Sequence, residues 1–327
     1  MLTKDIYTPQ QLLSLFEERV AISNFNAFPP GLYKPVNHIM SMKGKCIRPL
    51  LLLMSCDMFG GNIEEALNPA FAVEVFHNFT LVHDDIMDNA NLRRGVPTVH
   101  KLYGINSGIL AGDVMLSYAY KFLAMVSPEH IAGLFQIFNT TSIQIFEGQQ
   151  MDIDFEEREN VSEIEYLHMI EYKTSVLLGC CLQMGAVLAG ASEENQQLIY
   201  EFGKKLGLSF QIKDDYLDSF GEEEKVGKRI GGDILMNKKT YLFVSAWNRG
   251  NAAQKKQLLG LLKERDEKTK ITLVKELFEN TGARQQTIRT TEGLYLSAIE
   301  SLKSISLDSE LKEPLLEFAE KINNREF

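Results

Sequence analysis

Apolar side chains recur at intervals of three and four residues along most of the chain, which is the period of an amphipathic helix. The first such segment covers residues 9–27, and Thr8 followed by Pro9 is typical of a helix N-terminus. The same period predicts helices over 69–90, 108–126, 129–150, 162–190, 193–219, 239–248, 253–264, 267–280, 283–303 and 307–323. Strand-like alternation is scarce, and the breaks are short clusters such as Gly60-Gly61-Asn62. The pattern predicts an all-α protein.

No change of composition divides the chain. Its 327 residues are 45% hydrophobic, which is enough material for a large buried core. Neither an internal repeat nor a low-complexity linker interrupts it, and its polar motifs come from both halves. We therefore expect residues 1–327 to form a single large helical domain.

The charge of the chain limits its partners. A net charge of −10 argues against nucleic acid, so a phosphate-bearing ligand needs a local basic cluster or bridging metal ions. No uncharged apolar stretch approaches the roughly 20 residues of a membrane span, and no signal peptide is apparent. None of the cysteines forms a Cys-x-x-Cys pair, and we expect four buried thiols in a reducing cytoplasm: Cys46, Cys56, Cys180 and Cys181.

Two apolar helices end in the same acidic pattern. The two copies are Asp84-Asp85-Ile86-Met87-Asp88 and Asp214-Asp215-Tyr216-Leu217-Asp218. Within each copy the first and last aspartates lie on one helix face, where like charges repel unless a cation intervenes. Short carboxylates that supply only a few oxygens suit Mg²⁺, which completes its shell with water and substrate phosphates. One copy alone could be a solvated helix end, but two copies favour a cluster of metal ions.

Basic residues flank both acidic patterns. Lysines and arginines usually cover solvent-facing surfaces, but here they gather beside the aspartates of an acidic protein: Lys45, Arg48, Arg93, Arg94, Lys173, Lys228 and Lys239. We expect two anions bound side by side, one through metal and the other directly by Arg and Lys.

With these motifs the chain resembles the trans (E)-isoprenyl diphosphate synthases, or polyprenyl synthetases, from about residue 29 to about residue 245. The motifs that carry the resemblance are, in order, Asp84-Asp85-x-x-Asp88 with Arg93-Arg94-Gly95, Gly148-Gln149-x-x-Asp152, Lys173-Thr174, and Phe210-Gln211-x-x-Asp214-Asp215-x-x-Asp218. The resemblance implies a helical bundle of the isoprenoid synthase type around a central cavity, a homodimer, and three Mg²⁺ ions per active site. It also implies that isopentenyl diphosphate is joined to an allylic diphosphate.

The resemblance also implies residue roles. The metal ligands would be Asp84, Asp88 and Asp214, and the supporting carboxylates Asp85, Asp152, Asp215 and Asp218. The allylic diphosphate would be bound by Arg93, Lys173, Lys228 and Lys239, and isopentenyl diphosphate by Lys45, Arg48, His77 and Arg94. Thr174 and Gln211 would lie beside the reacting carbons. The family usually has Gly-Gly-Lys-Arg where this chain has Lys43-Gly44-Lys45-Cys46, which changes the isopentenyl site.

Product length is predicted from the helix before Asp84. Three side chains lie below Asp84 on roughly one side of this helix and can line the cavity into which a prenyl tail grows: Phe76, Phe79 and Thr80. Thr80 is small enough to let a short chain pass, whereas Phe79 is bulky enough to end the cavity, and Phe76 is equally explained as a core residue. The pattern is similar to short-chain synthases, so we expect geranylgeranyl diphosphate, with farnesyl diphosphate as the second choice.

Three alternatives stay open. A class I terpene synthase also uses an aspartate-rich motif, but it needs no second anion site. A ferritin-like di-iron protein would use the Glu-x-x-His pairs at Glu74 and Glu165, yet it leaves both aspartate motifs unexplained. A non-catalytic subunit of a heteromeric synthase would be expected to lose aspartates from these motifs. This chain keeps all six aspartates of the two motifs.

Overall fold

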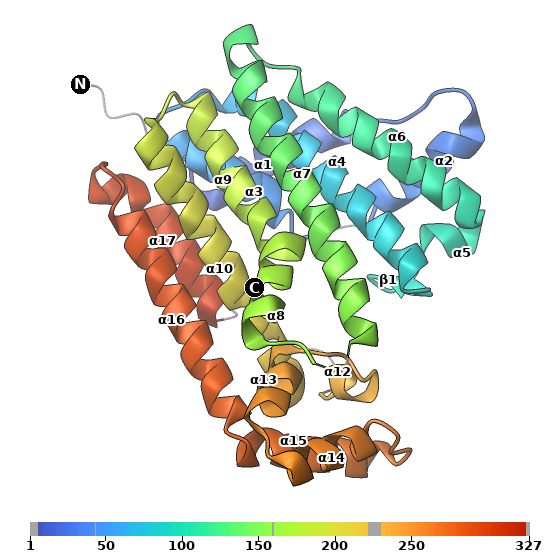
Figure 1. Cartoon of the computed structure of the whole chain (residues 1–327). Coiled ribbons are helices and arrows are strands. Elements are labelled where there is room, and N and C mark those ends of the chain that lie inside the picture. Colours follow the sequence, from blue (N-terminus) through green and yellow to red (C-terminus); the bar gives the residue numbers. More distant parts are fainter. Residues whose placement is uncertain (1–5, 43, 159, 222–229, 325–327) are drawn as a thin grey trace. The chain divides into compact units, whose positions relative to one another are not determined.

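The computed structural model describes residues 6–42, 44–158, 160–221 and 230–324. Helices make up nearly all of the regular structure in these residues (Figure 1). From the N-terminus they are α1 (Pro9–Ala21), α2 (Pro30–Met40), α3 (Ile47–Met58), α4 (Ile63–Met87), α5 (Val99–Tyr103), α6 (Ile105–Leu123), α7 (Pro128–Glu157), α8 (Glu163–Ile170), the π-helix η1 (Glu171–Ser175), α9 (Val176–Leu188), α10 (Glu193–Phe220), α12 (Gly232–Leu235), α13 (Tyr241–Arg249), α14 (Ala252–Leu261), α15 (Glu267–Asn280), α16 (Ala283–Lys303) and α17 (Ser309–Asn324). The strands β1 (Leu92–Arg93) and β2 (Val96–Pro97) form one antiparallel pair. The all-α prediction is confirmed.

Internal contacts divide the chain into two compact units. Unit 1 consists of Met1–Asn139, Cys180–Tyr200 and Ser306–Pro314, and unit 2 of Thr140–Gly179, Glu201–Ile305 and Leu315–Phe327. Each unit is therefore assembled from segments that are far apart in the sequence. The single domain over residues 1–327 stays a prediction.

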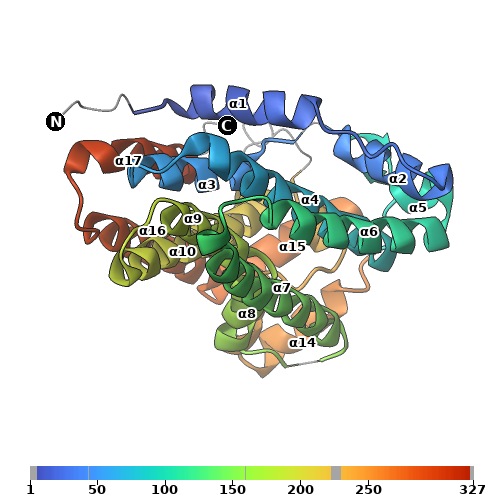
Figure 2. The same ribbon diagram turned by 90° about the horizontal axis from the view of Figure 1, so that it is seen from above.

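The core of unit 1 is built on α3 and α4. α6 runs beside α4, and α1 lies across α3 and α4 (Figure 2). Every residue of α3 from Pro49 to Met58 is buried. The sequence did not predict this helix, because a helix that is covered on all sides has no polar face and therefore no amphipathic period. It also did not predict α2, which contains Pro35.

The predicted start of the helix over 69–90 was wrong. α4 begins at Ile63, where Asn62 is the N-cap and its side chain accepts a hydrogen bond from the Glu64 amide. Pro69 thus lies inside the helix. A proline is frequent at a helix start, but a side chain that caps the orphan amides is the stronger signal.

The segment predicted as one helix over 162–190 contains a π-helical turn. α8 is followed directly by η1 and then by α9, so the backbone stays helical but gains one extra residue in the turn that contains Lys173 and Thr174. Insertions of this kind occur mostly at functional sites.

The core of unit 2 surrounds α13. This helix packs against α8, α15 and α16, and α15 also packs against α12 and α14. Its apolar centre includes Trp247 and Phe278, which are 7% and 2% exposed. No helix in the described ranges is both long and apolar enough to cross a membrane.

Candidate active site

The first aspartate motif lies at the C-terminal end of α4. Asp84 is half-buried, and Asp88 is the exposed C-cap residue. The last turn of α4 contains no basic residue, so these carboxylates lie at the negative end of the helix dipole without compensation from the helix itself. That arrangement is unfavourable in isolation and suits the binding of a cation.

Asp85 points into the protein and holds Arg93. It is 1% exposed, and both its oxygens accept hydrogen bonds from the Arg93 guanidinium, with Nη2 2.7 Å from Oδ1 and Nε 2.9 Å from the same oxygen. Such a paired contact fixes the plane of the guanidinium as well as its place. The geometry is compatible with the supporting role predicted for Asp85.

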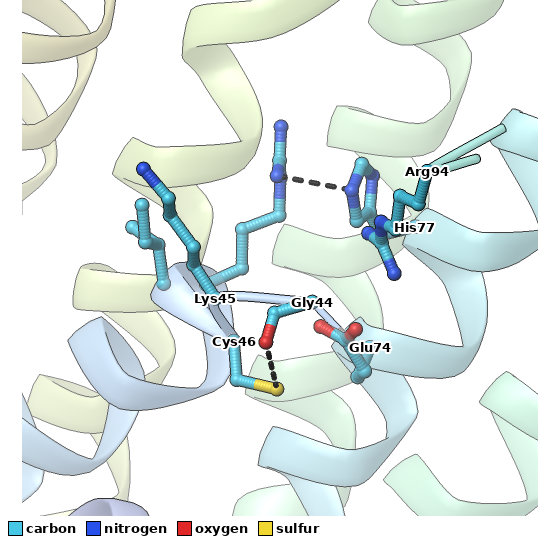
Figure 3. A pocket seen from close by; sticks show the side chains of 8 residues that line it. Gly44, Lys45, Cys46, Glu74, His77 and Arg94 are labelled. Carbon is cyan, nitrogen blue, oxygen red and sulfur yellow. Dashed lines mark hydrogen bonds between the residues drawn. The ribbon is translucent and has the colours of Figure 1, made fainter. Parts of the chain in front are cut away.

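The four side chains predicted to bind isopentenyl diphosphate line one pocket in unit 1. The pocket has a volume of about 520 Å³, a size that suits a small ligand. Figure 3 shows it from close by. Its lining residues are Gly44, Lys45, Cys46, Ile47, Arg48, Glu74, His77 and Arg94.

Within this pocket the two arginine side chains are held in place by polar contacts. Arg48 Nη1 lies 3.2 Å from His77 Nε2, and the Nε of Arg48 is buried with no hydrogen-bond partner among the described residues. Arg94 donates from Nη1 to the main-chain oxygen of Met42 at 2.7 Å. Gly44 lies under the guanidinium, because a Cβ added at this position would lie 2.9 Å from Arg94 Nη2. The two arginine guanidinium groups thus have fixed positions on the pocket wall.

His77 is neutral in this surrounding. Burial lowers its pKa well below the usual value, and the positive charges of Arg48, Arg94 and Arg93 lower it further. A neutral ring can accept the Arg48 hydrogen bond at Nε2 while Nδ1 carries the proton. His77 therefore orients the arginine instead of repelling it.

Glu74 was missed by the sequence analysis as a member of this pocket. It is 7% exposed and accepts a hydrogen bond from Asn78 Nδ2 at 3.0 Å. Burial raises the pKa of Glu74, although nearby Arg48 acts in the opposite direction. The available signal was its position three residues before His77, which places both on one helix face.

Cys46 was expected to be buried and is half-buried at the pocket wall. Burial raises the pKa of its thiol to about 12, so the thiol stays uncharged. The other cysteines are buried, as expected. Where the family usually has an arginine, this pocket therefore has a small neutral group.

The second aspartate motif lies in the last turns of α10, in unit 2. Asp215 is 1% exposed and accepts hydrogen bonds from the Tyr166 hydroxyl at 2.9 Å and from the Gln211 amide at 3.3 Å. Burial raises the pKa of Asp215 to about 6, although nearby Lys238 and the Tyr166 hydrogen bond act in the opposite direction. Asp214 and Asp218 are half-buried. Asp215 thus anchors the helix end on which its two neighbours are displayed.

Two residues outside the predicted set complete this cluster. The main-chain amide of Asp233 donates to Asp218 Oδ2 at 2.9 Å, and Lys238 Nζ lies 3.6 Å from Asp233 Oδ1. Burial alone would lower the pKa of Lys238, but four surrounding carboxylates outweigh it and raise that pKa: Asp215, Asp233, Asp152 and Asp214. Of the adjacent lysines Lys238 and Lys239, Lys238 is therefore the one that lies beside the aspartates.

The structure does not place Lys239 there. Its ammonium group donates to the main-chain oxygens of Phe155, Glu156 and Arg158, at the C-terminal end of α7. The assignment of Lys239 to the allylic diphosphate stays a prediction, and Lys238 is a second candidate because it lies beside the aspartates. The other candidate of this loop, Lys228, lies outside the described residues.

Lys173 and Thr174 are displayed by the π-turn of η1. Lys173 forms an ion pair with Asp152 of α7, and both side chains are about a third exposed. A Cβ added at Gly148 of α7 would lie 2.3 Å from the Lys173 amide nitrogen, and one added at Gly207 of α10 would lie 3.0 Å from Ser175 Cα. Two glycines thus allow the neighbouring helices to approach the backbone of the turn.

The residues predicted to limit product length are packed together in unit 1. Phe76 is fully buried and its ring centre lies 5.5 Å from that of Phe79 and 5.0 Å from that of Phe138. Phe79 is 5% exposed, and its ring also contacts His83. Thr80 is half-buried, and its hydroxyl donates to the main-chain oxygen of His77. Phe79 is thus held between aromatic neighbours on α4.

The aspartates at the two helix ends suit a metal ion that takes part of its ligands from the substrate. In the described part of the chain no group of three or more His, Cys, Asp or Glu side chains is gathered closely enough to hold a metal ion. Glu165, which a di-iron site would need, accepts hydrogen bonds from the Ser162 amide and the Arg158 guanidinium. A few short carboxylates at each helix end fit Mg²⁺, which keeps waters and takes phosphate oxygens.

The chain is similar to known proteins in both sequence and structure. A model of the polyprenyl synthetase family matches residues 29–281. The chain is 37% identical to a geranylgeranyl diphosphate synthase of Sulfolobus acidocaldarius over 88% of this chain and 89% of that protein, and 35% identical to a short chain isoprenyl diphosphate synthase of Methanothermobacter thermautotrophicus over 95% of each. A crystal structure of a geranylgeranyl pyrophosphate synthase superposes with a TM-score of 0.91 at 44% identity, covering 97% of this chain and 99% of that one. The chain therefore belongs to the polyprenyl synthetase family of prenyltransferases and has the all-helical isoprenoid synthase fold.

Proposed function

We propose that this prenyltransferase makes geranylgeranyl diphosphate from an allylic diphosphate and isopentenyl diphosphate. The observation that carries the proposal is the basic pocket of unit 1, which offers a diphosphate site whose lining contains none of the motif aspartates. The names of the relatives support the product of twenty carbons. Farnesyl diphosphate is the second candidate.

In the proposed reaction the two substrates bind at different charged sites. Lys45, Arg48 and Arg94 bind the diphosphate of isopentenyl diphosphate, and neutral His77 keeps Arg48 in place. This holds the double bond at a fixed position for attack, and such positioning supplies much of the rate.

The allylic diphosphate is bound at the aspartates. We propose three magnesium ions with Asp84, Asp88 and Asp214 as ligands, which would supply the positive charge that stabilises the departing diphosphate. The side chains of Arg93, Lys173 and Lys238 are each held by a carboxylate in the structure and offer further fixed cations. Thr174 and Gln211 are proposed to lie beside the allylic cation that departure leaves. The double bond of isopentenyl diphosphate then attacks this cation and forms the new carbon–carbon bond. A proton lost from the adjacent carbon, which we propose the released diphosphate accepts, restores the double bond of the product.

Incubation with isopentenyl diphosphate, each allylic primer in turn and Mg²⁺, followed by chromatographic sizing, tests this function. We expect a diphosphate of twenty carbons. A hydrocarbon released from one allylic diphosphate alone would instead show a terpene synthase, and no product with any primer would show a non-catalytic subunit. A product of fifteen carbons would select farnesyl diphosphate.

We propose that the protein acts as a homodimer in the cytoplasm. Apolar side chains are exposed along α5 and α6 in unit 1, at 43–57% of their surface: Leu102, Ile105, Ile109 and Leu110. Exposed apolar side chains that gather on two successive helices support a protein interface there. The four cysteines are free, which suits a reducing compartment. Light scattering that gives the mass of one chain would contradict the dimer.

Replacing Phe79 by alanine is expected to lengthen the product. The ring of Phe79 is held by Phe76 and His83, so its removal opens space at the proposed end of the cavity without moving Asp84. The fraction of products beyond twenty carbons should rise, and Phe79→Leu should give a smaller increase. If both variants keep the wild-type distribution in the same assay, another side chain, such as Tyr118, ends the cavity.

A further inference from the structure

One lysine that the proposed chemistry does not use is buried in unit 2. Lys270 of α15 is 4% exposed and lies beside Val274 and Phe278. A buried ammonium group is unfavourable unless hydrogen bonds replace its hydration. Its Nζ donates to Asn237 Oδ1 at 2.6 Å and to the main-chain oxygen of Leu235 at 3.4 Å. Both acceptors belong to the end of α12 and the turn that follows it.

The turn after α12 holds two charged residues, Asp233 and Lys238, beside the second aspartate motif. Asn237 adopts a left-handed backbone conformation with φ of 57°, and its Nδ2 donates to the main-chain oxygen of Leu262 at 3.2 Å. Lys238 comes next, and its amide donates to the main-chain oxygen of Asp233 at 2.9 Å. The Asp233 amide in turn donates to Asp218. A shift of the turn would therefore move Lys238 and Asp233 together.

We propose that Lys270 is a positioning residue that fixes this turn, so that Lys238 meets the allylic diphosphate. An apolar side chain of similar length would fill the same space without loss of hydration, and such replacements often stabilise a protein. Packing alone thus does not explain a lysine at this position, whereas its two hydrogen bonds to the turn do. The inference rests on the proposed contact between Lys238 and the allylic diphosphate.

Steady-state kinetics of Lys270→Met test the proposal. We expect the KM for the allylic diphosphate to rise about tenfold, the equivalent of one lost polar contact, with the KM for isopentenyl diphosphate unchanged. The thermal midpoint should stay the same or rise. Lys268→Met, which removes an exposed lysine of the same helix, is the matched control and should change neither KM. Equal increases in both KM values, or a lower thermal midpoint with unchanged KM values, would show a packing role and overturn the proposal.

Two more variants separate this inference from the proposed function. Asn237→Gly removes the nearer of the two acceptors of Lys270 but tolerates the same φ, and it should reproduce the kinetic effect even if Lys270→Met does not fold. Lys238→Met should raise the same KM, and adding Lys270→Met to it should cause no further increase. If Lys238→Met leaves the allylic KM unchanged, the proposed role of Lys238 is wrong. If it raises that KM while Asn237→Gly and Lys270→Met do not, only the role of Lys270 is wrong.

Discussion

Asp84→Ala and Asp214→Ala are each expected to lower kcat by about 10³-fold or more, because loss of a metal ligand removes several kcal/mol of transition-state stabilisation. Both side chains lie near the C-terminal end of a helix whose last turn has no basic residue. Removal of the Asp84 carboxylate relieves repulsion with the helix dipole, worth about 0.3–1 kcal/mol. Removal of the Asp214 carboxylate relieves repulsion with Asp218, four residues further along the helix, worth about 0.2–0.5 kcal/mol. The thermal midpoint should therefore stay the same or rise while turnover is lost.

Turnover at saturating Mg²⁺ and circular dichroism melting check this pair of effects. Glu276→Ala, which removes an exposed carboxylate of α15, is the control and should leave both quantities unchanged. Near-normal turnover in either aspartate variant would exclude that residue as a metal ligand. A large fall in thermal midpoint would assign it to the fold instead.

Arg48→Ala is expected to raise the KM for isopentenyl diphosphate by about 10–100-fold and the KM for the allylic substrate much less. A hydrogen bond between charged groups contributes about 1.5–3 kcal/mol, which corresponds to this range. Arg48 lines the basic pocket, and its buried Nε has no hydrogen-bond partner in the described part of the chain. Loss of Arg48 should therefore weaken binding of the ligand of this pocket more than binding of the other substrate.

Initial rates measured with each substrate varied in turn distinguish the two sites. Arg289→Ala, which removes an exposed arginine of α16, should change neither KM. An equal rise in both KM values for Arg48→Ala would mean that the pocket does not belong to one substrate. That outcome would leave the metal assignment untouched, because the pocket lining contains no aspartate.

Helical period was enough to predict the all-α fold, since residues three or four apart share a helix face. The resemblance to the family, carried by the order of its motifs, selected four of the side chains that line the basic pocket. Turns carry no such period. Lys238 and Lys239 are adjacent, yet one lies beside Asp233 and the other donates to the end of α7. The left-handed conformation of Asn237 and the contacts of the turn, which are tertiary, separate them.

Completely buried or locally irregular elements escaped prediction for related reasons. α3 is covered on all sides, so its sequence has no polar face to mark it. The π-turn that displays Lys173 depends on the close approach of other helices at Gly148 and Gly207, which are distant in the sequence. Glu74 could have been found, because it lies one helical turn before His77.

The close approach at Gly148 limits how this protein can change over evolutionary time. Any other residue there would bring a carbon to 2.3 Å from the Lys173 amide nitrogen, and a main-chain atom cannot move aside as a side-chain tip can. Position 148 can therefore accept a larger residue only if the backbone of α7 or of η1 shifts. A substitution at position 148 is thus tied to the backbone that displays Lys173, although the two residues lie in different helices.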